Sequence, residues 1–183
     1  MKDSKTEILD FWFVESVPAQ WFQKSDEFDS AIRERFGAIY EMAKDGFYNS
    51  WMQDADGHLA LCLTLDQFPR NMFRNSPRAF ESDAKALTVS KKAISLGLDQ
   101  VLVAHKRRFL YLPFEHSENL EDQKRSVELF ATMQEDDPLG YDYALRHMKV
   151  IEEFGRFPHR NAALGRESTE AEKEYLSKDG SGF

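Results

Sequence analysis

Apolar residues recur along most of this chain at the three- and four-residue spacing of a helix with one buried face. The pattern is clear in the run that Ser25 precedes as a predicted N-cap and that Gly46 follows as a predicted stop. The apolar positions of this run are Phe28, Ala31, Ile32, Phe36 and Ile39. The same spacing in the other segments predicts an all-α protein.

The segment from 59 to 65 is apolar on nearly every side, which predicts a helix in the middle of the packed structure. Because a proline displaces the preceding residue from the α region, Pro69 predicts that this helix ends at Phe68. Residues 109–112, Phe-Leu-Tyr-Leu, have the composition of a strand. Their isolation among helical segments favours a buried connector or a helical turn, followed by a break at Pro113.

Polar residues, glycines and prolines divide the chain into helices with short connections. A long helix is predicted to begin at Ser76-Pro77 and to end at Gly97, and Asp137-Pro138 separates two later helices. The further predicted N-caps are Ser4, Ser117, and Ser168 or Thr169. These elements predict about seven to nine antiparallel helices. They form a single domain over residues 1–177, with a flexible tail over residues 178–183.

The formal net charge of −8 and the isoelectric point of about 5.2 disfavour nucleic acid and anionic membranes as partners. Cys62 is the only cysteine, which excludes an intramolecular disulfide and is typical of a reducing compartment. The N-terminus lacks the apolar run of a signal peptide, and no apolar stretch approaches membrane-spanning length. We therefore predict a soluble cytoplasmic protein, whose oligomeric state the composition leaves open.

Two distant segments share one motif. Residues 66–71 read Asp-Gln-Phe-Pro-Arg-Asn, and residues 154–161 read Phe-Gly-Arg-Phe-Pro-His-Arg-Asn. Each segment sets an aromatic residue before a proline and brings an arginine and an asparagine after it. We call these segments the first and the second corner. They are expected to interrupt helices and to direct their polar groups into one shared hollow.

Arginines gather at the predicted helix ends, where a planar guanidinium can hold a carboxylate or a phosphate through two hydrogen bonds. We predict an anionic small molecule or a peptide group as the ligand. The predicted ligand-binding residues are Arg70, Asn71, Arg74, Glu118, Arg156, Arg160 and Asn161. The alternative is internal pairing, in which carboxylates such as Asp66 and the free carbonyl groups at helix ends neutralise the arginines.

Candidate catalytic residues lie in or near the corners. Asp66 ends the most buried helix and could act as a base if no cation fully compensates its charge. Glu115 and His116 are the minimum pair for acid–base chemistry. His147 points inward with the apolar face of its helix, and His159 lies inside the second corner. The alternative interpretation gives Ser117 and Glu118 a capping role, and makes the histidines ordinary core or loop residues.

Motifs for bound metals and cofactors are absent. The sequence contains no His-Glu-x-x-His motif, no Cys-His framework, no calcium-type acidic loop, no phosphate-binding glycine loop and no nucleophile elbow. We predict neither a metal nor a cofactor.

Three segments together resemble a widespread bacterial family that is catalogued as a domain of unknown function. The segments are residues 65–71, residues 109–118 (Phe-Leu-Tyr-Leu-Pro-Phe-Glu-His-Ser-Glu) and residues 154–166. The likeness extends from about Ile8 to Leu176. It implies the right-handed α-α superhelix of the tetratricopeptide-repeat-like superfamily, and it implies no reaction. Because the usual tetratricopeptide consensus is missing, peptide binding does not carry over.

The sequence supports three hypotheses. The first is a binding module in which the corners and residues 115–118 line a pocket for an anionic group. The second is a hydrolase or lyase that acts on an anionic small molecule, with Glu115 or Asp66 as the base and a histidine as the acid. The third is a structural polar network that pins the helices together, with a protein-interaction role elsewhere on the surface.

Overall fold

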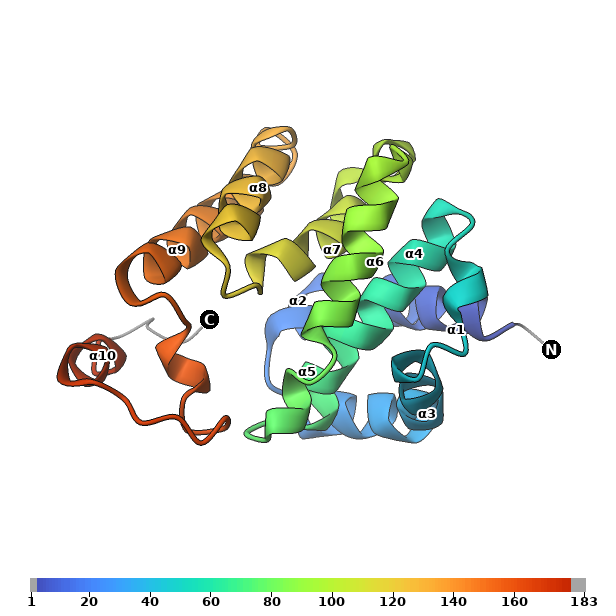
Figure 1. Cartoon of the computed structure of the whole chain (residues 1–183). Helices are drawn as coiled ribbons and strands as arrows, with labels where there is room; N and C mark the ends of the chain where they lie inside the picture. Colours follow the sequence, from blue (N-terminus) through green and yellow to red (C-terminus); the bar gives the residue numbers. More distant parts are fainter. Residues whose placement is uncertain (1–2, 179–183) are drawn as a thin grey trace. The chain divides into compact units, whose positions relative to one another are not determined.

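The computed structural model describes residues 3–178, and this part of the chain is helical and contains no strand (Figure 1). The prediction of an all-α protein is therefore confirmed. The superhelical, tetratricopeptide-like arrangement and the single domain stay predictions. Of the predicted tail, Lys178 lies among the described residues, with its Nζ 3.5 Å from Glu174 Oε1. The remainder of the tail lies outside them.

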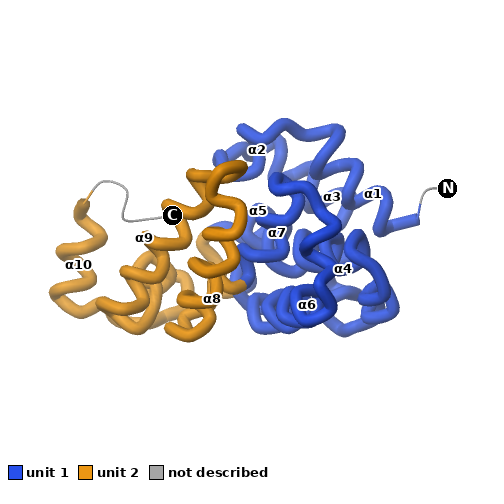
Figure 2. Tube along the Cα trace, turned by 90° about the horizontal axis from the view of Figure 1, so that it is seen from above, with its two compact units in different colours: residues 1–74, 78–113 blue, residues 75–77, 114–183 orange. Residues whose placement is uncertain are grey.

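The chain divides into two compact units (Figure 2). Unit 1 comprises Met1–Arg74 and Arg78–Pro113, and unit 2 comprises Asn75–Pro77 and Phe114–Phe183. The helices that lie in unit 1, or begin there, are α1 (Ser4–Asp10), α2 (Pro18–Phe22), α3 (Asp26–Lys44), α4 (Ala55–Cys62), α5 (Phe68–Met72), α6 (Asp83–Ser95) and α7 (Ala104–Glu115). The helices of unit 2 are α8 (Leu120–Ala131), α9 (Pro138–Phe154) and α10 (Glu170–Leu176).

Short segments of other helical types connect or extend these helices. Two are π-helical, η1 (Phe11–Glu15) and η3 (Leu63–Gln67). The 3-10 segments are η2 (Asn49–Trp51), η4 (Pro77–Ala79), η5 (Leu98–Val101) and η6 (Pro158–Arg160). None of the helices between residues 3 and 178 combines the length and apolar character that crossing a bilayer requires.

The core of unit 1 is built around α4 and η3, where all residues from 57 to 69 are buried. This confirms the prediction of a central helix that is apolar on nearly every side. Phe68 stacks on Phe36 of α3 at a centroid distance of 5.0 Å, and Trp12 of η1 meets Phe109 of α7 edge to face at 5.6 Å. Each such aromatic ring contributes about 2–3 kcal/mol when it is fully buried. Cys62 is buried here as well, and burial raises the pKa of its thiol.

The helix does not end at Phe68, so that prediction was wrong. The chain widens into the π-helical turns of η3 and continues into α5, and Phe68 keeps α-region angles of −56° and −43°. Pro69 has no N–H to donate to the carbonyl of Leu65. The hydroxyl of Ser82, at the N-terminus of α6, donates to that carbonyl instead at 2.6 Å. A side chain distant in sequence therefore replaces the missing backbone donor.

Pro113 does not break its helix either, because α7 runs through it from Ala104 to Glu115. Residues 109–112 are buried and helical, as the interpretation of a helical turn predicted. Ser90 of α6 donates a hydrogen bond to the carbonyl of Leu110, in the turn of α7 that precedes the proline. Ser82 and Ser90 therefore donate hydrogen bonds to carbonyl groups that lie near Pro69 and Pro113, respectively.

The predicted helix ends agree with the structure at Ser25, Gly97 and Thr169. Ser25 caps α3, Gly97 follows α6 with φ of 68°, and Thr169 forms a capping box with Glu172. The other predicted N-caps are displaced. Asp3 rather than Ser4 caps α1, Asn119 rather than Ser117 caps α8, and Ser76-Pro77 leads into η4 before α6 begins at Asp83.

The core of unit 2 lies between α8, α9 and the loop that follows α9. Phe157 is completely buried, and it clusters with Val150 and Ile151 of α9. Leu120, Phe154 and Tyr175 pack around this cluster. The apolar face of α9 therefore faces the second corner, and this packing brings the polar residues of the corner close to α9.

Candidate functional site

The arginine of the first corner is held by carboxylates of unit 1. Arg70 donates to both oxygens of Asp83 at 2.9 Å, and its Nη1 lies 3.2 Å from Asp66 Oδ1. Gln67 donates to the other oxygen of Asp66 at 2.6 Å. The predicted pairing of Asp66 with Arg70 is therefore present, and a catalytic role for Asp66 stays a prediction.

Asn71 and Arg74 meet a second buried carboxylate, which the sequence analysis missed. Asp29 of α3 accepts from Asn71 Nδ2 at 2.8 Å and from Arg74 Nη2 at 2.9 Å, and Arg74 Nε also donates to it. Asp29 is only 5% exposed. A signal for this role was available, because Asp29 shares the helical face of Ile32 and Phe36. A carboxylate on an apolar face needs a buried partner.

The second corner has its own carboxylate partners in unit 2. Arg156 donates to Glu172 of α10 at 2.6 and 2.9 Å and to the carbonyl of Glu167 at 2.8 Å. Asn161 donates to Ser168 Oγ at 3.0 Å and accepts from Arg166 Nε at 2.9 Å. These contacts fold the loop after η6 back against α10.

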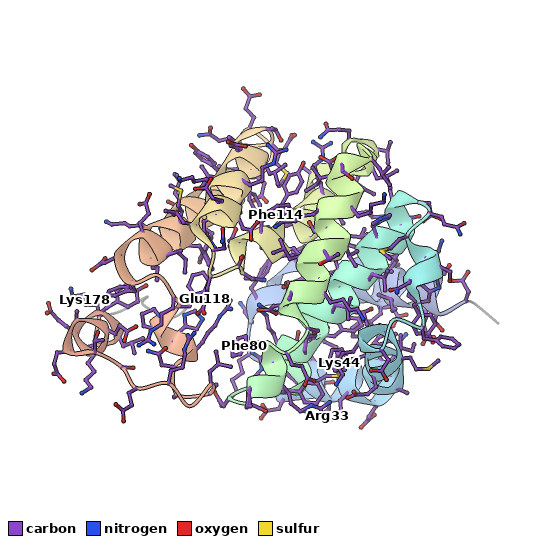
Figure 3. All side chains as sticks on the ribbon, in the orientation of Figure 1. Arg33, Lys44, Phe80, Phe114, Glu118 and Lys178 are labelled. Carbon is purple, nitrogen blue, oxygen red and sulfur yellow. The ribbon has the colours of Figure 1, made fainter. Side chains whose placement is uncertain are left out.

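Glu118 connects the second corner to the segment between α7 and α8 (Figure 3). It accepts from the N–H of Phe157 at 2.8 Å and pairs with both terminal nitrogens of Arg166, at 2.7 and 2.9 Å. Burial tends to raise the pKa of Glu118, but the bonds from Arg166 and Phe157 lower it overall. Asn119 is the N-cap of α8, so Glu118 precedes the helix, and the alternative interpretation that gave Glu118 a capping role was wrong.

The remaining polar candidates surround Phe157 in unit 2. Phe157 lies 5.5 Å from the ring of His147 and 5.6 Å from that of His159, and the guanidinium of Arg160 lies over it at 4.5 Å. His116 lies 6.3 Å from His147, between ring centroids. We call His116, His147, His159 and Arg160, together with Glu115, the histidine cluster. The fold thus brings together Glu115, His116, His147 and His159, which the sequence analysis proposed as catalytic.

His147 is oriented by two acceptors. Its Nδ1 is 2.9 Å from the carbonyl of Tyr143 and 3.2 Å from Glu115 Oε1. Burial lowers the pKa of His147, and the positive charges of His116, Arg160 and His159 lower it further. The ring is therefore neutral at pH 7, with the proton on Nδ1 and a lone pair on Nε2. This arrangement can accept a proton or a hydrogen bond at Nε2.

The cluster reaches the surface through its partly buried rings. His147, Glu115 and Arg160 are at most 5% exposed, whereas His116 and His159 are of intermediate exposure. Two adjoining cavities of about 400 and 470 Å³ also lie in unit 2, between α9 and α10, and Arg156 lines the second of them. No residue of the histidine cluster lines either cavity, so the acid–base groups described above lie outside both of them.

Metal ligation has little support in the part of the chain that the structure describes. There, three or more His, Cys, Asp or Glu side chains do not converge with the geometry that a metal ion needs. The first corner belongs to unit 1 and the second to unit 2. A hollow that both corners share stays a prediction, as does a ligand-binding role for Arg70, Asn71, Arg74, Glu118, Arg156, Arg160 and Asn161.

One consequence of the Arg156–Glu172 contact is a dependence of stability on pH. Hydrogen bonds from Arg156 lower the pKa of Glu172 from 4.5 to about 2, against the effect of burial. Since the folded-state pKa lies below the unfolded one, Glu172 stabilises the fold above pH 4.5, and this contribution is lost as the pH falls towards 2. We expect Glu172→Gln to lower the free energy of unfolding at pH 7 and to lower it less at pH 3.5, as measured by urea denaturation.

The control for this prediction is Glu170→Gln in the same helix. Glu170 is 90% exposed in its contact with Lys173, so its removal should change stability little at either pH. Equal effects of the two substitutions at pH 7 would contradict a special role for Glu172.

Comparisons with known proteins support the fold and leave the activity open. Residues 8–180 match the model of a family described as "Bacterial protein of unknown function (DUF924)". A solved structure of a protein of unknown function from Agrobacterium tumefaciens is 38% identical to this chain, with a TM-score of 0.88. The match covers 94% of this chain and 96% of the other. A comparison with curated proteins found no match. The predicted resemblance to a bacterial family of unknown function is thereby confirmed, and the chain belongs to the DUF924 family of bacterial proteins.

Proposed function

We propose that unit 2 is a binding module for an anionic group of a small molecule or peptide, and that the histidine cluster receives this group. The observation that carries the proposal is the composition of the cluster around Phe157. Basic side chains from the turn after α7, from α9 and from η6 lie there, and Glu115, the last residue of α7, contacts His147. Four of its five side chains are basic and one is acidic.

The direction of the His147 pKa shift supports an anionic ligand. Burial is the main reason why protonation of His147 is unfavourable and its pKa is lowered in the empty cluster, and repulsion from the neighbouring positive groups adds to this. An anion placed beside these groups reverses that effect, because an opposite charge within about 4–6 Å favours the charged form of a histidine. Binding is therefore coupled to proton uptake, and the affinity for an anion increases as the pH falls.

The other predicted binding residues have a supporting role in this proposal. Glu118 and Arg166 hold the N–H and the carbonyl of Phe157, and Asn161 bonds to Arg166. Arg156 fixes α10 through Glu172. These contacts set the position of His159 and Arg160, which lie between Phe157 and Asn161 in the chain. In unit 1, Arg70, Asn71 and Arg74 are engaged by Asp66, Asp83 and Asp29.

Sulfate is a suitable probe, because its charge does not change between pH 5 and 8. We expect sulfate to raise the pKa of the cluster histidines in side-chain NMR titrations, and to bind more tightly at pH 6 than at pH 8. Replacing His159 by alanine removes one charge-assisted hydrogen bond, which is worth about 1.5–3 kcal/mol, so we expect binding at pH 6 to weaken at least about tenfold.

His105→Ala is the matched control, since His105 is an exposed histidine of unit 1 and should leave sulfate binding unchanged. Equal sulfate affinities of the wild type and His159→Ala would contradict the proposal. Arg160→Ala tests the structural alternative. A large loss of stability with unchanged sulfate affinity would assign Arg160 to a structural network instead.

A second candidate function, a hydrolase or lyase, is favoured by the 3.2 Å contact between Glu115 Oε1 and His147 Nδ1. A carboxylate that holds Nδ1–H keeps the lone pair on Nε2, as a general base requires. If the protein is such an enzyme, His147→Gln should still bind the anionic substrate but should no longer convert it to product. Binding without any conversion supports the binding module alone.

A further inference from the structure

A buried glutamine of α8 bonds to the turn that carries two residues of the histidine cluster. Gln123 is completely buried. Its Nε2 donates to the carbonyl groups of Glu115 and Ser117, each at 2.6 Å, and more weakly to that of Phe114 at 3.4 Å. One side-chain amide therefore holds the backbone on both sides of His116.

The position of Gln123 in α8 explains how its amide reaches this turn. α8 begins at Leu120, so Gln123 lies in the first turns of the helix. A helical side chain points back toward the N-terminus of its own helix, which directs the amide to the chain that precedes α8. Glu115 is the last residue of α7, and the carbonyl groups at a helix end need donors from outside the helix. Gln123 supplies such a donor.

The same turn determines where the side chains of Glu115 and His116 lie. Glu115 Oε1 is 3.2 Å from His147 Nδ1, and the ring centroid of His116 is 6.3 Å from that of His147. The contact between Glu115 and His147 has little room to lengthen, because at about 3.6 Å it would no longer be a hydrogen bond. A small displacement of the turn would therefore separate the carboxylate from the imidazole.

We propose that Gln123 is a positioning residue of the histidine cluster, which holds the Glu115 carboxylate against His147 through the backbone of the turn between α7 and α8. All three acceptors are carbonyl oxygens, so the NH₂ group of the amide, and not its oxygen, has to face the turn. Gln123 acts through Glu115 and needs no contact with a ligand. Its effect on anion binding rests on the function proposed for the cluster, whereas its effect on His147 does not.

Gln123→Met tests this role, because methionine fills a similar volume and donates no hydrogen bond to the turn. A nearby carboxylate favours the charged form of a histidine, so withdrawal of Glu115 should lower the pKa of His147. We expect a decrease of about 0.5 in side-chain NMR titrations of the ligand-free protein. Sulfate binding at pH 6 should then weaken about threefold, because protonation of His147 becomes less favourable by that factor.

Two further variants separate positioning from a general loss of stability. Ser126→Ala is the matched control, since Ser126 is also completely buried in α8 and its hydroxyl has no hydrogen-bond partner among residues 3–178. This substitution should change neither the pKa of His147 nor the sulfate affinity. Glu115→Gln removes the carboxylate through which Gln123 acts. Adding Gln123→Met to Glu115→Gln should therefore lower stability without any further decrease in the pKa of His147.

An unchanged pKa of His147 in folded Gln123→Met would overturn the proposal, and so would an equal decrease with and without the Glu115 carboxylate. If the wild type binds no sulfate, the proposed function fails, and the titrations of the ligand-free proteins still decide the role of Gln123. If Gln123→Met does not fold, hydrogen exchange in the wild type decides it. Slower exchange of the side-chain amide protons of Gln123 than of the exposed Gln134 supports the proposal, and equal rates overturn it.

Discussion

Replacing Gly57 by alanine is expected to lower the free energy of unfolding by about 3 kcal/mol. A Cβ at this position would lie 1.9 Å from the carbonyl oxygen of Trp51 and 2.8 Å from its carbonyl carbon. Both are backbone atoms, so a change of side-chain rotamer cannot relieve the overlap. The first turn of α4 and η2 would have to separate, and the hydrogen bond from Gly57 N–H to Asp54 Oδ1 at 2.7 Å would be strained.

Gly37→Ala is the control for this prediction. Gly37 lies within α3, and a Cβ there would meet nothing within 4 Å. Because alanine restricts the unfolded chain more than glycine does, this substitution should stabilise the protein by up to about 1 kcal/mol. Urea denaturation of both variants measures the two effects. Similar midpoints for Gly57→Ala and the wild type would show that η2 can move away at little cost.

Replacing Asp29 by alanine is expected to lower the free energy of unfolding by about 3 kcal/mol. The carboxylate of Asp29 holds both Asn71 and Arg74, and its loss leaves the buried Asn71 amide and the guanidinium without that acceptor. Removal of one partner of a buried ion pair commonly costs about 3–5 kcal/mol. Because the Arg74 side chain is 32% exposed, water compensates part of its charge, and we expect the lower end of that range.

Two further variants identify the cause of this loss. Asp142→Ala removes an exposed ion pair with Arg146 and should change stability by less than about 0.5 kcal/mol. Adding Arg74→Met to Asp29→Ala removes the uncompensated charge and should restore part of the stability. Chemical denaturation of the wild type, Asp29→Ala, Arg74→Met and the double variant gives the coupling energy. Strictly additive losses for Asp29 and Arg74 would contradict an ion pair that acts as a unit.

Helical periodicity predicted the fold class and the central position of α4, because both depend on how apolar residues are spaced. The rule that a proline ends a helix failed at Pro69 and at Pro113. At Pro69, the carbonyl of Leu65 that the proline leaves without its backbone donor accepts from the hydroxyl of Ser82, 17 residues away. At Pro113, Ser90 bonds to the neighbouring carbonyl of Leu110, 20 residues away, and α7 runs through the proline. A local rule cannot include a donor that only tertiary structure supplies.

For the candidate site too, local sequence patterns predicted individual residues but not the tertiary contacts between them. The sequence singled out Glu115, His116 and His159 as polar residues beside predicted helix breaks, and His147 as a polar residue on the apolar face of its helix. Their meeting around Phe157 depends on how α9 packs, which no local pattern specifies. The carboxylate partners of Arg74 and Arg156 were missed because Asp29 and Glu172 lie 45 and 16 residues away from these arginines.

The hydroxyl groups of Ser82 and Ser90 also limit how this fold can be recombined. A chimera that receives the α6 region of a relative without serines at these positions would inherit two buried carbonyl groups that lack these donors, although every helix in it keeps its own sequence. The α6 region can therefore be exchanged only together with the two proline-containing segments that it contacts. These three segments would have to be transferred as one piece.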